Sequence, residues 1–320
     1  MTPQPTNVSV ALPVSLAIDR VKRVLFQPFD LGKWFTIGFC AWLAHLGEAG
    51  FRGNFNFNSS HGNRDFRQGL EQAKEFVVNN LYWIVPVAVA IFVVSLGLWV
   101  LFTWLSSRGK FMFLHCVALD KAEVVVPWDK FAREANSLFL FRIVLGLIGM
   151  AATLPLVVLA VVMGVGMFAR AGLWICGILG LIGVVLVMVA VGIVFFLIAK
   201  LTTDFVAPIM FLRGGRCLNA WRELFGLISA NVGHFVLYLL FQIVLGIAIS
   251  AIVLAAILVT CCCACCLMAI PYIGTVLLLP VLMFKRAYSA HYLAQFGREY
   301  DVFAVPAAPA PGIMPTVAPA

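Results

Sequence analysis

Charged residues are scarce in this sequence, and their scarcity excludes most kinds of protein. Asp, Glu, Lys and Arg together make up 11% of the 320 residues, against about 25% in an ordinary globular domain. Hydrophobic residues make up 63%, and the mean hydropathy is +1.03. A water-soluble fold would lack the polar surface to cover such a core, and a disordered chain would carry far less apolar mass. The composition therefore predicts that lipid surrounds most of the chain.

Six apolar segments are candidates for membrane-spanning helices, which need about 20 residues each. None of them contains Asp or Glu, and none shows the polar alternation of a barrel strand, so helices are expected. The segments cover residues 34–47, 81–105, 138–169, 173–199, 234–260 and 267–284, and the first is short. We predict an all-α integral membrane protein with six transmembrane helices in three hairpins, each preceded by a cytoplasmic interfacial amphipathic helix.

This arrangement divides the chain into three parts. Residues 1–33 form a cytoplasmic N-terminus with an amphipathic helix, and residues 34–304 form the polytopic membrane domain. Residues 305–320 are rich in Pro and Ala and cannot build a core, so we expect a disordered cytoplasmic tail.

The distribution of Lys and Arg predicts the orientation. With a cytoplasmic N-terminus, 17 of the 22 basic residues fall on the cytoplasmic side and only 5 on the other. The five are Arg52, Arg64, Arg67, Lys74 and Arg170. Cytoplasmic loops are enriched in basic residues, so both termini are expected in the cytoplasm. The net charge of +8 is explained by the anionic cytoplasmic leaflet, without a nucleic-acid partner.

A weak internal repeat supports the hairpin arrangement. Residues 140–146 and 240–246 match at six of seven positions, 100 residues apart, near the start of two predicted spans. An amphipathic segment precedes each match, and a third precedes the first predicted span. The alternative is that neighbouring membrane hairpins simply look alike. The expected apolar faces are Leu16, Ile18, Val21 and Leu25; Trp128, Phe131, Ala132, Ala135 and Leu138; and Trp221, Leu224, Phe225 and Ile228.

The region between residues 100 and 290 resembles a known membrane domain. The resemblance is carried by Ala220-Trp221 following the segment 204–208 (Asp-Phe-Val-Ala-Pro), and by the hairpin pattern after it. It is to the membrane-anchoring domain of some bacterial glycerophosphodiester phosphodiesterases and to related uncharacterised prokaryotic multi-pass families. The resemblance implies a protein of the bacterial cytoplasmic (inner) membrane. No phosphodiesterase domain is present, and no catalytic residue can be carried over.

Polar groups close to the predicted spans are the candidates for function, because ionisable groups in a membrane are costly. Arg142 lies about one turn inside its span, and Gln242 occupies the corresponding position of the repeat. Asp204 follows the fourth span and could pair with Arg142. These three are the predicted binding residues. The alternative is that Arg142 extends to the headgroups at the cytoplasmic surface.

The nine cysteines do not predict a metal site. Five of them lie in the run Cys261–Cys266, where neighbouring side chains on a helix diverge by about 100° and cannot meet at one ion. Packing at a tight turn is the favoured interpretation, with redox or metal chemistry as the alternative. Cys40, Cys116, Cys176 and Cys217 are isolated and are expected to fill the core. No cofactor is expected.

No combination of residues predicts catalysis, because no Ser-His-Asp or Cys-His arrangement can be assembled. We therefore expect a non-enzymatic multi-pass membrane protein that serves as a membrane module for lipid or protein partners. Membrane lipids, a protein partner or a second copy of the chain are the expected partners. The alternative is a transporter or channel for a small solute or lipid.

Overall fold

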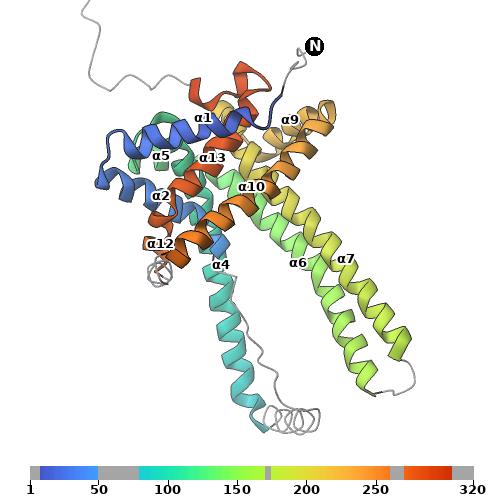
Figure 1. The fold of residues 1–320 in the computed structure, drawn as a ribbon. Coiled ribbons are helices and arrows are strands. Elements are labelled where there is room, and N and C mark those ends of the chain that lie inside the picture. The colour runs from blue at the N-terminus through green and yellow to red at the C-terminus, as the bar shows by residue number, and fades with distance from the viewer. Residues whose placement is uncertain (1–7, 50–78, 170–173, 260–269, 305–320) are drawn as a thin grey trace, which may run out of the picture.

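The computed structural model describes residues 8–49, 79–169, 174–259 and 270–304, and these residues are almost entirely helical, with no strand among them (Figure 1). The α-helices are α1 (Leu12–Val21), α2 (Leu31–Ala49), α4 (Leu81–Leu119), α5 (Val125–Lys130), α6 (Ala132–Ala169), α7 (Trp174–Leu201), α8 (Ala207–Arg213), α9 (Cys217–Ala230), α10 (Val232–Val259), α12 (Pro271–Leu277) and α13 (Leu279–Ala294). Two π-helices, η1 (Lys22–Phe26) and η2 (Thr202–Val206), and two 3₁₀-helices, η3 (Arg298–Tyr300) and η4 (Val302–Ala304), complete the set. The all-α prediction is confirmed over this part of the chain.

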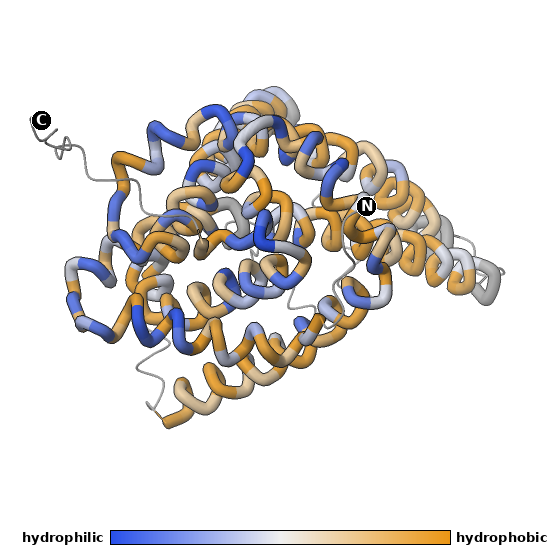
Figure 2. Tube along the Cα trace, turned by 90° about the horizontal axis from the view of Figure 1, so that it is seen from above, coloured by the Kyte–Doolittle hydropathy of each residue, from blue (hydrophilic) through white to orange (hydrophobic). Residues whose placement is uncertain are grey.

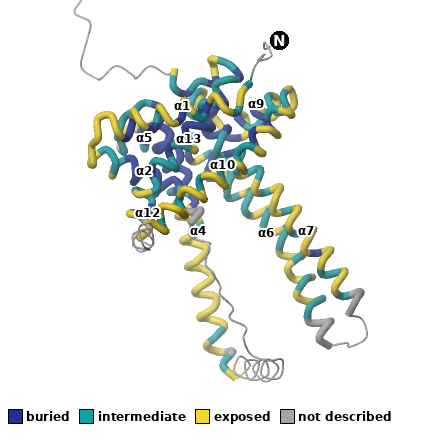
Figure 3. The backbone as a smooth tube through the Cα atoms, viewed as in Figure 1, coloured by how far each residue is buried: buried dark blue, intermediate teal, exposed yellow. Residues whose placement is uncertain are grey.

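The molecule has two regions that differ in burial (Figure 3). The head comprises residues 8–49, 103–138, 199–238 and 270–304, and it contains nearly all of the buried residues. The arms comprise residues 81–102, 139–169, 174–198 and 239–259, and their apolar side chains are largely exposed. The outer part of α4 and the α6–α7 pair project from the head in one direction (Figure 1). Hydrophilic residues gather on the head, whereas the arms are hydrophobic along their length (Figure 2).

Within the described ranges, four helices are long and apolar enough to cross a membrane. They cover Tyr82–Leu119, Ala132–Gly164, Gly177–Arg213 and Val232–Val259, and almost none of the residues in their most apolar stretches is buried inside the protein. These helices contain the predicted spans at 81–105, 138–169, 173–199 and 234–260, apart from the residues outside the described ranges. The four helices indicate a membrane protein.

The four helices also extend beyond the predicted spans. α4 continues to Leu119, well past the predicted end at residue 105, and α6 begins at Ala132, six residues before the predicted start. Within α4, Arg108 and Lys110 interrupt the apolar pattern, but each has a protein partner in the head. Arg108 Nη1 donates to the carbonyl of Trp128 at 3.3 Å, and Lys110 Nζ donates to Thr203 Oγ1 at 2.8 Å. A helix therefore passes from lipid-facing to protein-facing surroundings without a break.

The two other predicted spans, residues 34–47 and 267–284, are not among these four helices, and their crossing of a membrane stays a prediction. The segment 34–47 lies in α2, whose Ile37, Cys40 and Ala44 are buried in the head rather than exposed. At Gly109 of α4, an added Cβ would lie 2.4 Å from the backbone nitrogen of Ala44, so the two backbones touch. The segment 267–284 is divided, where described, between α12 and α13 at Leu278. The structure thus supports four spans, and the six-span, three-hairpin arrangement is not confirmed.

Aromatic side chains hold α10 and α13 together in the core of the head. Tyr238 of α10 lies 4.6 Å from Tyr292 and 5.9 Å from Tyr288 between ring centroids, and Phe205 of η2 contacts Tyr238 at 4.8 Å. The Tyr292 hydroxyl donates to the carbonyl of His234 at 2.7 Å, so its polar end is also satisfied. Such ring pairs contribute about 0.5–1.5 kcal/mol each beyond their buried area.

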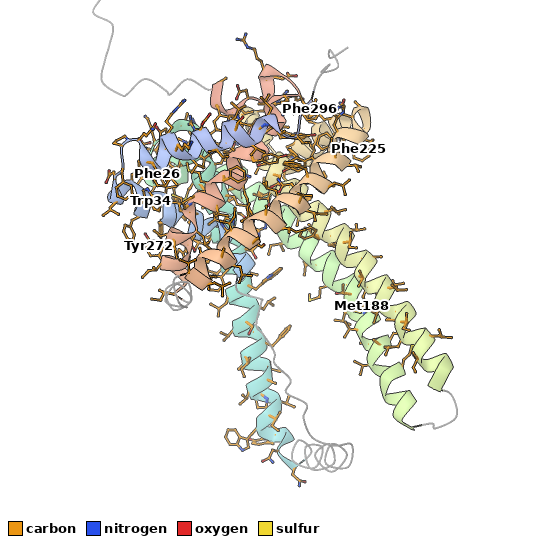
Figure 4. All side chains as sticks on the ribbon, in the orientation of Figure 1. Phe26, Trp34, Met188, Phe225, Tyr272 and Phe296 are labelled. Atoms are coloured by element: carbon orange, nitrogen blue, oxygen red, sulfur yellow. The ribbon has the colours of Figure 1, made fainter. Side chains whose placement is uncertain are left out.

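The edge of the head at α2 is also aromatic (Figure 4). Phe26 and Trp34 lie close together, with ring centroids 5.6 Å apart, and the Tyr272 hydroxyl donates to the carbonyl of Phe35 at 2.9 Å. That bond ties α12 to α2. Met188, by contrast, lies on the α7 arm, away from these contacts (Figure 4).

The three segments predicted to be amphipathic belong to the head. Some of the residues that they bury differ from the predicted ones. α1 buries Pro13, Ala17 and Val21, while the predicted Leu16 and Ile18 are exposed. In the second segment, Phe131, Ala135 and Leu138 are buried as one face, and in α9 Leu224 is buried whereas Phe225 is exposed. Their location at a lipid interface stays a prediction. The run Cys261–Cys266 and the tail at 305–320 lie outside the described residues.

Candidate functional site

The predicted binding residues lie in a group of polar side chains where the head meets the arms. This polar cluster is assembled from five parts of the chain, namely α4, α6, the α7–η2 junction, α10 and α13. It consists of Ser106, Ser107, Lys110, Arg142, Lys200, Thr203, Asp204, Tyr238, Gln242, Lys285 and Arg286.

The π-helix η2 gives Thr203 and Asp204 their positions. The N–H of Ala207 bonds to the carbonyl of Thr202, five residues back, and the next residue is Pro208, which has no N–H to continue an α-helical ladder. Thr202 and Thr203 bond back to the carbonyls of Ile198 and Ala199, at 2.6 and 3.1 Å. Single π turns of this kind are frequent at functional sites.

Asp204 and Gln242 are brought together by the hydroxyl of Tyr238. Tyr238 donates to Asp204 Oδ2 at 3.0 Å, and Gln242 Nε2 donates to the Tyr238 oxygen at 3.0 Å. Lys200 Nζ lies 2.8 Å from the same carboxylate oxygen. Tyr238 is fully buried, so the bonds satisfy a polar group that would otherwise be costly. Asp204 and Gln242, at the two ends of this hydrogen-bond network, were predicted from the sequence, whereas Tyr238 between them was not.

Arg142 binds a different part of the cluster. Its Nη1 donates to Ser106 Oγ at 3.1 Å and to Ser107 Oγ at 3.4 Å. Ser106 in turn donates to the carbonyl of Ala44 at 2.7 Å, so Arg142 joins α6 to the contact between α4 and α2. The ion pair between Arg142 and Asp204 stays a prediction.

Cations outnumber carboxylates in the polar cluster. Lys110 and Arg286 are only 7% exposed, and Arg286 Nη1 donates to the carbonyl of Thr203. With Arg142, Lys200 and Lys285 the polar cluster contains five cations and one carboxylate, that of Asp204. Partial burial lowers the pKa of Lys285, the charge of Lys200 lowers it further, and Asp204 raises it. The cluster therefore creates a positive potential at the boundary between head and arms, where an anionic group would be stabilised.

The sequence contained a usable signal for part of this cluster. Lys200 and Asp204 are four residues apart, as are Tyr238 and Gln242, and residues at this spacing share a helix face. The contacts of Lys110 and Arg286 with Thr203 join positions more than 80 residues apart, and no local pattern predicts them.

The described cysteines form no metal site. No group of three or more His, Cys, Asp or Glu side chains suited to a metal ion occurs in the described ranges. Cys40 and Cys116 are buried with their sulfurs 3.9 Å apart, and burial raises the pKa of Cys217 to about 12. These three residues are free thiols inside the head.

Trp128, predicted to lie on the apolar face of an interfacial amphipathic segment, takes part in a cation–π stack. The guanidinium of Arg108 lies 4.8 Å from the ring centroid of Trp104 and 4.6 Å from that of Trp128. Trp104 Nε1 donates to Asn136 Oδ1 at 3.3 Å. The stack fastens α5 to α4 at the same level as the polar cluster. The location of Trp128 at a lipid interface stays a prediction.

No curated protein and no solved structure matches the chain. Residues 10–297 match a family of unknown function, DUF7544, and this range includes the arms, every residue of the polar cluster and all of the head except its first two and last seven residues. The chain therefore belongs to the DUF7544 family.

Proposed function

We propose that this protein is a non-enzymatic, multi-pass protein of the bacterial cytoplasmic membrane that acts as a membrane module for lipids. Both termini and the head lie on the cytoplasmic side, in keeping with the distribution of Lys and Arg. A relationship to the membrane-anchoring domain of glycerophosphodiester phosphodiesterases remains part of this hypothesis.

The exposed apolar surface of the arms is the observation that carries the proposal. Ile91 of α4, Leu186 of α7 and Ile247 of α10 are 61%, 63% and 66% exposed. Leaving such surface in water would cost about 25 cal/mol for each Å², whereas lipid removes that cost. Among the described arm residues only Arg142 is charged, so the arms suit the hydrocarbon core of a bilayer.

The polar cluster supports a lipid partner rather than a catalytic role. It lies at the head end of the arms, where lipid phosphates would lie in the proposed orientation. Its groups are mainly cations and hydroxyls that bind one another, and Asp204 is held by Lys200 and Tyr238. This arrangement can hold or attract an anion, but it presents no nucleophile paired with a general base.

Membrane extraction and site-specific labelling test the proposal. The protein should remain in the membrane fraction after alkaline extraction. In a background without the nine native cysteines, Asn79→Cys at the tip of α4 and Lys121→Cys in the head should label from opposite sides with an impermeant thiol reagent. Release by alkali, or labelling of both positions from one side, contradicts the proposed arrangement.

A transporter or channel is the second candidate, favoured by the buried cations beside a π-helix. Lys110, Arg286 and Thr203 could provide a site for an anionic solute at the mouth of the arms. Uptake or conductance in proteoliposomes distinguishes the two functions. Flux that Lys110→Met abolishes would favour transport, and lipid co-purification without flux would favour the membrane module.

A further inference from the structure

A cavity of about 880 Å³ lies between α6 and the start of α9, outside the polar cluster. Its walls come from two stretches of chain, residues 133–144 and residues 215–218. Ser137 Oγ accepts a hydrogen bond from the N–H of Cys217 at 2.9 Å, which fixes the first turn of α9 against α6. The cavity is therefore formed by parts of the head that are joined directly to each other.

One end of the cavity is charged. Arg133 and Arg216 supply two guanidinium groups, both on exposed residues, and Glu134 supplies the only carboxylate in the lining. The Oε2 atom of Glu134 is buried and has no hydrogen-bond partner among the described residues. An unpaired buried carboxylate oxygen is costly, and a rotation of the Glu134 side chain that turns the carboxylate into the cavity would let a hydrogen-bond donor of a ligand satisfy it.

The other end of the cavity is apolar and continues onto an arm. Leu140 and Val144 of α6 line this end, Leu218 of α9 also lines the cavity, and all three are exposed. Arg133, Leu140 and Val144 share a face of α6, because the spacings of seven and four residues correspond to whole turns. The distance along the helix from residue 133 to residue 144 is about 16 Å at about 1.5 Å per residue. The cavity thus changes from charged to apolar in the direction from head to arm.

We propose that this cavity binds one phospholipid whose headgroup carries both a phosphate and an ammonium group, such as phosphatidylethanolamine. Arg133 and Arg216 bind the phosphate, Glu134 accepts a hydrogen bond from the ammonium, and an acyl chain lies along Leu140 and Val144. This inference rests on the proposed function, since it requires the arms to lie in a bilayer.

The charges of the lining favour this headgroup over a purely anionic one. Guanidinium groups bind phosphate through paired, charge-assisted hydrogen bonds. A headgroup without an amine would leave the carboxylate of Glu134 beside the phosphate, where like charges repel. Discrimination therefore comes from Glu134, and affinity comes from the two arginines.

Lipid retention by the purified full-length protein tests the proposal. Protein reconstituted in equal amounts of phosphatidylethanolamine and phosphatidylglycerol is extracted in detergent, and retained lipids are counted by mass spectrometry. Wild type should retain phosphatidylethanolamine in preference. The double variant Arg133→Gln/Arg216→Gln should retain about tenfold less, which corresponds to the loss of one charge-assisted interaction. Glu134→Gln should still retain phospholipid but lose the preference for the amine headgroup.

The control is Arg222→Gln, which removes an exposed arginine of α9 that does not line the cavity, and its retention should equal that of wild type. Thermal unfolding of each variant in detergent identifies any that fail to fold. Equal retention of both lipids by wild type, or unchanged retention by the double variant, overturns the inference and leaves the proposed function standing. Failure of wild type to remain in membranes overturns both.

Discussion

The head and the arms both contain many large apolar residues, but they bury them in opposite ways. In the head, Phe205, Tyr238 and Tyr288 are completely buried, whereas most large apolar residues of the arms are exposed. Every described Asp and Glu lies in the head, and Arg142 is the only charged residue described in the arms. Large apolar residues therefore occur in both regions, whereas nearly all of the described charged residues lie in the head. Polar side chains lie mainly where helices pack on each other, and few of them lie on the exposed apolar surface of the arms.

The largest effect is expected where the head packs most closely. Gly109→Val places a branched side chain where a Cβ alone would meet the backbone of Ala44, so α2 and α4 must separate. We expect a loss of ~3 kcal/mol or more in the free energy of unfolding. Thermal unfolding in detergent measures it.

Gly97→Val is the matched control on the arm part of α4. No atom lies within 4 Å of a Cβ at Gly97, so unfolding should change little. Equal destabilisation by the two variants would show that the close contact at Gly109 does not distinguish the head from the arm.

A charged residue introduced on an arm tests whether lipid or water surrounds that arm. Val187 is 49% exposed near the middle of α7, and arginine at the centre of a spanning helix costs about 2.5–3.5 kcal/mol. Val187→Arg should therefore lower the inserted fraction in a membrane-insertion assay. Val125→Arg, at an exposed position of the head, should insert as wild type does. Normal insertion of Val187→Arg would mean that this face of α7 does not contact lipid.

Removal of one hydroxyl tests the connection between the two regions. Tyr238→Phe keeps the aromatic packing but leaves Asp204 and Gln242 without their shared partner. We expect a loss of about 1–3 kcal/mol in the free energy of unfolding, the usual cost of an unsatisfied buried polar group. Tyr82→Phe, at the exposed tip of α4, serves as the control and should be neutral. Should both variants unfold at the wild-type temperature, the hydroxyl network contributes no stability.

The smallest effect is a dependence of head stability on pH. Burial lowers the pKa of His291 to about 4, and the ring lies 4.0 Å from that of Phe303 between centroids. The unfolded residue has a pKa of about 6.5, so it binds a proton more readily than the folded one. The contribution of neutral His291 is complete above pH ~6.5 and is lost as the pH falls towards 4. Because one proton is bound, the slope cannot exceed about 1.4 kcal/mol per pH unit, and solvent screening of the partly exposed ring makes it smaller.

His291→Phe should flatten this dependence. Unfolding temperatures recorded between pH 6.5 and 4.5 compare the variant with wild type, and His45→Phe on α2 is the control histidine. An unchanged profile in His291→Phe would assign the acid sensitivity of the head to other groups.

Local sequence patterns predicted the helical class and the four longest apolar helices, because lipid-facing runs of this length have few alternative interpretations. They also led to Arg142, Asp204 and Gln242, because polar groups near such runs are rare. They did not predict Tyr238 or Thr203 as the links between these groups. Both side chains are ordinary constituents of helices, and only the packing of η2, α10 and α13 makes them central.

The sequence by itself determined that most of this chain is not surrounded by water, because it has too few charged residues to cover a water-exposed surface. The tertiary structure alone decided whether the apolar side chains of a segment are buried in the protein core or exposed along an arm. The side chains of α2 and α13 leave water by packing in the head, and those of α4, α6, α7 and α10 expose apolar surface along the arms. Lipid and a protein core remove apolar surface from water about equally well, so hydropathy cannot distinguish them. Only contacts between distant residues, such as Gly109 with Ala44, show which of the two surrounds a helix.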